Sequence, residues 1–73
     1  MKVKIRLDTM KDINQFVNIC SKVSEPVHIT DGAGLRVSAK SILGVMYSME
    51  FDEIWCETEA NLYSQLDSFI IVD

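Results

Sequence analysis

Residues 27–39 read VHITDGAGLRVSA, and this stretch decides the fold. Apolar and polar side chains alternate on both sides of its centre, which is the period of a half-buried β-strand. The centre, residues 31–34 (DGAG), is rich in the residue types that tight turns prefer. The stretch therefore predicts two neighbouring strands joined in a hairpin.

Upstream of the hairpin, the pattern predicts a strand followed by a helix. Residues 2–7 alternate between apolar and charged side chains, so we expect a half-buried strand there. In residues 10–23, apolar side chains recur at the spacing of one helical face, which predicts a helix that Asp8 or Thr9 caps. The apolar stripe consists of Ile13, Phe16, Val17 and Cys20. Pro26 cannot continue this helix and leads into the hairpin.

Downstream of the hairpin, we expect a second helix and a fourth strand. Ser41 is a suitable N-cap for a short helix over residues 42–49, whose apolar residues are crowded enough to give it two apolar sides. Residues 53–57 alternate again and predict a strand. Keeping the acids in water puts Ile54, Cys56 and Thr58 on the buried face and Glu53, Trp55 and Glu57 on the open face.

The closing segment, residues 62–70, carries apolar side chains at helical spacing and predicts a third, amphipathic helix. The order of elements is then β-α-β-β-α-β-α. Strands that are apolar on one side, next to helices that each need an apolar surface, predict an α+β fold. We expect a single domain over residues 1–73, a four-stranded antiparallel sheet covered on one face by three helices.

Composition and charge exclude several classes of function. With 48% hydrophobic and 25% charged residues in 73, the chain is expected to fold without a ligand. Its net charge of -4 argues against a nucleic-acid partner, because such proteins cluster Lys and Arg. No apolar run reaches the roughly 18 to 20 residues of a membrane span, and the N-terminal stretch lacks the core of a signal peptide. We therefore expect a cytoplasmic protein that does not bind a membrane.

Cys20 and Cys56 stand alone in the sequence and belong to no CxxC pair or zinc-ligand cluster. Each lies among residues expected in the core, so both are predicted to be buried free thiols, as in a reducing compartment. No metal or other cofactor is indicated.

Residues 40–46, KSILGVM, resemble the second-helix motif of HPr, the small phosphocarrier protein of the bacterial sugar phosphotransferase system. The resemblance extends over almost the whole chain through the order of elements. Ser21 and Lys22 near the end of the first helix, and the spacing from the hairpin to Ser41, fit with about one inserted residue. The resemblance implies the HPr-like open-faced β-sandwich.

The phosphoacceptor histidine of HPr is missing here. HPr proteins carry Gly-(Ile or Leu)-His-Ala-Arg-Pro at the start of the first helix, whereas residues 7–12 of this chain read LDTMKD. Thr9 stands at or near the histidine position and Lys11 at the arginine position. A phosphothreonine ester is a stable sink, and Asp8 and Asp12 would repel a phosphoryl group. We therefore expect no phosphocarrier activity, although a working phosphocarrier in sugar transport remains the alternative.

The family also uses its second helix for regulation and binding. By resemblance, Ser41 is a candidate regulatory phosphorylation site, and Ile42, Leu43 and Met46 are candidate contacts for a protein partner. Thr9 and Lys11, in the loop before the first helix and in its first turn, complete the candidate surface. In the alternative interpretation, Ser41 is only an N-cap and the apolar residues belong to the core.

Two further hypotheses concern charged residues. The acids between Glu50 and Glu59, with His28, could form a small catalytic or metal site, but their alternation between faces favours solvated charges, and we expect no enzyme. The second hypothesis is a purely structural role as a piece of a larger assembly.

Trp55 is expected on the open face of the sheet. Either the Arg6 stem covers its ring while charges pair across the strands, or the face forms a homodimer.

Overall fold

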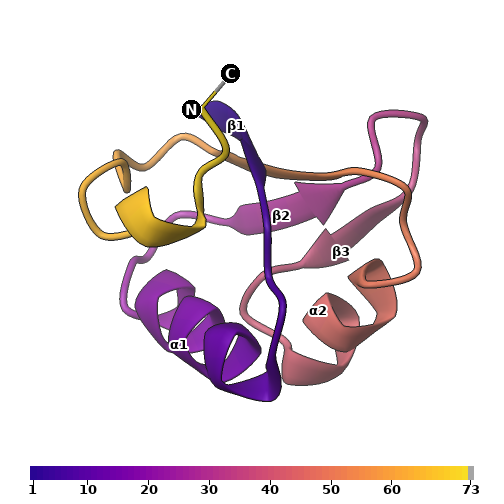
Figure 1. Ribbon diagram of the computed structural model, residues 1–73. Helices are drawn as coiled ribbons and strands as arrows, with labels where there is room; N and C mark the ends of the chain where they lie inside the picture. The colour runs from indigo at the N-terminus through magenta and orange to yellow at the C-terminus, as the bar shows by residue number, and fades with distance from the viewer. Residues whose placement is uncertain (73) are drawn as a thin grey trace.

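Residues 1–72, which the computed structural model describes, form four antiparallel strands and two α-helices (Figure 1). In chain order the elements are β1 (Lys2–Ile5), α1 (Met10–Ser21), β2 (Val27–Thr30), β3 (Arg36–Ser38), α2 (Ile42–Ser48) and β4 (Ile54–Thr58). The strands lie in the order β1-β4-β2-β3. Both helices lie on one side of the sheet, and the other side is open, so the α+β class and the antiparallel sheet are confirmed.

The hairpin prediction is confirmed, because β2 and β3 pair directly around the predicted turn. The Asp31 side chain organises that turn by accepting from the backbone N–H groups of Ala33 (2.7 Å) and Leu35 (3.1 Å). Gly32 and Gly34 adopt φ angles of 81° and 119°, which residues with a Cβ rarely reach. Strand β3 is one residue shorter at each end than the apolar alternation suggests.

Helix α1 has the predicted buried stripe, formed by Ile13, Phe16, Val17 and Cys20. Thr9, rather than Asp8, is its N-cap. The helix ends at Ser21, two residues before the predicted end, because Lys22 is already its C-cap. The Lys40 side chain donates to the carbonyl of Val23 (2.6 Å) and so satisfies a backbone acceptor just beyond the helix.

The predicted third helix over residues 62–70 is wrong. The structure has turns there, followed by a single 3-10 turn, η1 (Asp67–Phe69). The chain then runs along the outer edge of β1, where the Arg6 N–H donates to the Phe69 carbonyl (2.8 Å) and the Ile71 N–H donates to the Lys4 carbonyl (2.9 Å). Pairing with a free strand edge replaces the backbone bonds that a helix would have made.

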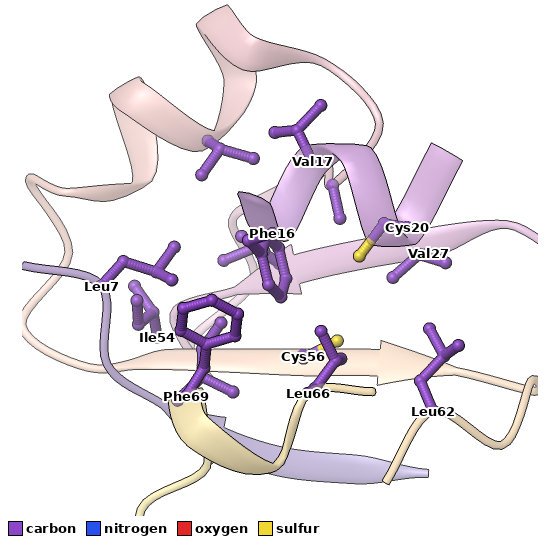
Figure 2. Close-up of a cluster of buried hydrophobic side chains, with 14 of the residues drawn as sticks. Leu7, Phe16, Val17, Cys20, Val27, Ile54, Cys56, Leu62, Leu66 and Phe69 are labelled. Carbon is purple, nitrogen blue, oxygen red and sulfur yellow. The ribbon is translucent and has the colours of Figure 1, made fainter. Parts of the chain in front are cut away.

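The core lies between the sheet and the two helices, and the closing segment, residues 62–70, covers one side of it (Figure 2). Leu62, Leu66 and Phe69 are buried although their segment is not an α-helix. The rings of Phe16 and Phe69 meet edge to face, with centroids 6.0 Å apart. The face assignment of β4 is confirmed, since Ile54, Cys56 and Thr58 are all buried.

Both cysteines are buried and free, as predicted. The pKa of the Cys20 thiol lies far above its ordinary value, because of its hydrogen bond with Cys56 and because burial disfavours the thiolate. A thiol held in the neutral form is a poor nucleophile, so Cys20 acts as a small core side chain.

Candidate functional site

Helix α2 is oriented by its first turn. The Ser41 hydroxyl accepts from the Gly44 N–H (3.1 Å), which confirms Ser41 as the N-cap. Gly44 faces the sheet, and a Cβ added there would lie 3.1 Å from the Ser38 carbonyl oxygen. This close approach lets the helix lie directly against the end of β3, with Val45 and Ser48 turned inward and buried.

The outer side of α2 carries an unusual concentration of exposed apolar residues. We call the following five the α2 patch: Ile42, Leu43, Met46, Tyr47 and Met49. Their exposed fractions run from 41% for Met46 and Met49 to 78% for Leu43. The interpretation that places Ile42, Leu43 and Met46 in the core is therefore wrong. Residues three and four apart are neighbours on a helix, so the five form one continuous surface.

A shallow pocket lies next to the C-terminal end of the α2 patch. It has a volume of about 250 Å³ and lies between the end of α2, the start of β4 and the end of β1. Met49, Phe51 and Ile54 contribute apolar surface to it. Its charged lining residues are Lys4, Arg6, Asp52 and Glu53.

Sequence reasoning missed Tyr47 and Asp52 as parts of this surface and took Met49 for a crowded helix residue. Tyr47 follows Leu43 by four residues, and this spacing is the signal that would have placed it on the patch. The ring of Tyr47 also packs edge to face on Phe51, with centroids 5.7 Å apart. The patch is thereby connected to the pocket.

The N-terminus of α1 is capped by its N-cap residue and by an acidic side chain from its own first turn. The Thr9 hydroxyl accepts from the Asp12 N–H (3.1 Å), and the Asp12 carboxylate accepts from the N–H groups of Asp8 (2.9 Å) and Thr9 (3.2 Å). This is a capping box, and the Thr-x-x-Asp spacing in the sequence could have indicated it. A carboxylate therefore already accepts from two of the amides at this helix end, which otherwise favours anions.

Of the two candidate residues at this end of α1, Thr9 is thus engaged in the cap, while Lys11 is exposed in the first turn. Helices α1 and α2 lie side by side (Figure 1).

On the open face of the sheet, pairs of charged side chains surround Trp55. The Lys2 ammonium lies 5.8 Å from the centre of the Trp55 ring, and the indole N–H donates to Glu53 (3.3 Å). The expected contact from Arg6 is wrong, because Arg6 lies beyond the end of β1 and pairs with Asp8 (3.2 Å). Lys2 is the diagonal neighbour of Trp55 in the β1–β4 register, which explains why Lys2, and not Arg6, lies over the ring.

The predicted pairing of charges across the strands is confirmed. Lys4 pairs with Glu53 (3.1 Å), and Glu57 lies near Lys2 (3.9 Å) and Arg36 (3.6 Å). Hydrogen bonds from Lys4 and then from Trp55 hold the pKa of Glu53 below its ordinary value. These acids are thus solvated partners of basic residues.

His28 lies in β2, as predicted, and its Nδ1 accepts from Arg36 (3.1 Å). In residues 1–72, no three side chains of the metal-ligating types His, Cys, Asp and Glu gather closely enough to hold an ion. No helix of this part of the chain has the length and apolar character to cross a membrane.

Comparisons of the chain with protein-family models, with curated proteins and with solved structures find no match.

Proposed function

We propose that the chain is an HPr-like protein-binding or regulatory module that docks a partner through the α2 patch and does not carry phosphate. The observation that carries the proposal is the exposure of five large apolar side chains on one short helix and its C-cap residue, Met49. Scattered exposed apolar residues are ordinary, but a continuous apolar patch of this kind typically marks a contact surface.

The HPr-like assignment has support from the arrangement of the elements. Strand β4 lies between β1 and β2, as in the HPr strand order, and Ser41 of the KSILGVM motif stands at the start of α2. The turns over residues 62–66 and η1 depart from the three-helix pattern that the resemblance implies.

The absence of phosphocarrier activity has support from the N-terminus of α1. A carrier needs a nucleophilic imidazole next to amides that can receive the phosphoryl oxygens. Here Thr9 stands in place of the imidazole, and the Asp12 carboxylate accepts from the amides of Asp8 and Thr9. A phosphate at these two amides would have to displace a carboxylate that is attached to the helix itself.

The proposal includes Ser41 as the regulatory site. Ser41 is exposed and lies directly before Ile42 and Leu43 of the patch. A phosphate there would add roughly two negative charges at the edge of an apolar docking surface. We also place the module in the cytoplasm, because two free thiols fit a reducing compartment.

A pull-down from the native lysate tests the docking surface. We expect the wild-type protein to retain a partner that Met46→Asp loses, because a charge in the centre of an apolar contact is left without a counter-ion. Leu35→Asp is the matched control, since Leu35 is also exposed and apolar but lies in the hairpin. Circular dichroism verifies that both variants are folded. Equal retention by all three proteins would contradict the proposal.

A further inference from the structure

Two acids without a basic partner follow the α2 patch. Glu50 and Asp52 are exposed, and neither forms an ion pair within residues 1–72. The last turn of α2 contains no basic residue either. Because the C-terminal end of a helix already carries partial negative charge, these two carboxylates lie where the isolated domain gains nothing from them.

Within the described part of the chain, one carboxylate of the adjoining pocket also lacks a basic partner. Of its charged lining residues, Lys4 is engaged by Glu53 (3.1 Å) and Arg6 by Asp8 (3.2 Å), whereas Asp52 has no such partner. The pocket therefore has an apolar wall, to which Met49, Phe51 and Ile54 contribute. Beside this wall, the Asp52 carboxylate is free to accept from a cation.

We propose that the partner presents a cationic amphipathic segment, with an apolar side chain in the pocket and a Lys or Arg at Asp52 and Glu50. This inference rests on the proposed docking function and adds the charge of the partner to it. A cation at this end would satisfy both the carboxylates and the helix end, whereas an acidic segment would be repelled. The net charge of -4 attracts the same class of partner over longer distances.

A pair of synthetic peptides tests the inference. The probe is an amphipathic helical peptide of leucine and lysine, and its counterpart has glutamate at every lysine position. Binding is followed by amide chemical shifts of the labelled protein. We expect the lysine peptide to bind more tightly than the glutamate peptide, with shifts concentrated at Met46, Tyr47, Met49 and Phe51.

Variants separate a specific contact from general attraction to an acidic protein. The double variant Glu50→Gln and Asp52→Asn should weaken binding of the lysine peptide about fivefold at low salt, the effect of two exposed ion pairs. Glu59→Gln removes an exposed acid beyond the other end of β4 and should leave the affinity nearly unchanged.

Three results would overturn the inference. They are equal binding of both peptides, no binding of either peptide, and binding of the lysine peptide that Glu59→Gln weakens as much as the double variant does. If both peptides bind alike while Met46→Asp still loses the partner from the lysate, the docking function stands and only the charge of the partner is wrong.

Discussion

Thr9 and Asp12 show how two side chains decide the chemistry of a helix end. They satisfy amides at the start of α1 reciprocally, so Thr9 acts as the structural cap of this helix. We expect the purified protein to accept no phosphate from phosphoenolpyruvate and the general phosphotransferase enzyme.

Thr9→His alone should restore little transfer, because Asp12 still occupies the neighbouring amides. An acid-labile phosphoryl adduct on any residue of the wild-type protein would contradict this prediction. A further variant, Thr9→His with Asp12→Pro, separates two causes of absent transfer. One is the lack of an imidazole at position 9, and the other is the Asp12 carboxylate that accepts from the neighbouring amides.

Ser41 has a cap role that is measurable without any partner. Ser41→Ala should lower the free energy of unfolding in urea by about 1 kcal/mol, because the Gly44 N–H loses its acceptor. Ser24→Ala is the control, since the Ser24 hydroxyl contacts only the exposed Glu25 side chain. Equal free energies of unfolding for the two variants would contradict the cap role of Ser41.

Incubation with an HPr kinase tests the second role of Ser41. Phosphate at the start of α2 is compatible with the fold, because the N-terminal end of a helix favours negative charge. Labelling of the wild-type protein that Ser41→Ala abolishes is the expected result. No labelling would leave Ser41 as a cap alone.

At the level of elements, the closing segment depends on two strand-like bonds. Ile71→Pro removes the N–H that donates to the Lys4 carbonyl, and we expect a loss of about 1 kcal/mol in the free energy of unfolding. The amide of Arg6, which donates to Phe69, should exchange its hydrogen faster. Val72→Pro is the control, because Val72 is 88% exposed.

The elements differ in how far their sequence predicts them. The β2–β3 hairpin is predictable because Asp31 and its two glycines form the turn locally. The closing segment misleads because the spacing of Leu62, Leu66 and Phe69 suits a helix, while a series of turns buries the same side chains. The free edge of β1, which decides between the two, is a property of the assembled sheet.

The candidate site is predictable only in part, for a related reason. The motif places Ser41 at the start of α2, but crowded apolar residues on a short helix do not reveal which side is buried. That choice depends on Gly44, which lies against the Ser38 carbonyl from another element. The position of the pocket beside Met49 likewise depends on β1 and β4 together.

For the whole molecule, the open face raises the question of a homodimer. Lys2, Lys4 and Arg36 already pair with the acids around Trp55, so burial of this face would desolvate several ion pairs. We therefore expect sedimentation to show a monomer at high concentration and Trp55 emission that is independent of dilution. Emission at shorter wavelength that reverts on dilution would instead support a dimer through this face.

The segment that runs along β1 also limits how the protein can polymerise. Because backbone groups of Lys4 and Arg6 are bonded to the chain's own C-terminal end, extension of the sheet by other copies is blocked at that side. The opposite border is β3, which is only three residues long. Two copies that met through β3 would use up their remaining borders and stop at a pair. A fibre that grows by sheet extension needs two reactive borders on every subunit, and residues 1–72 leave one, that of β3.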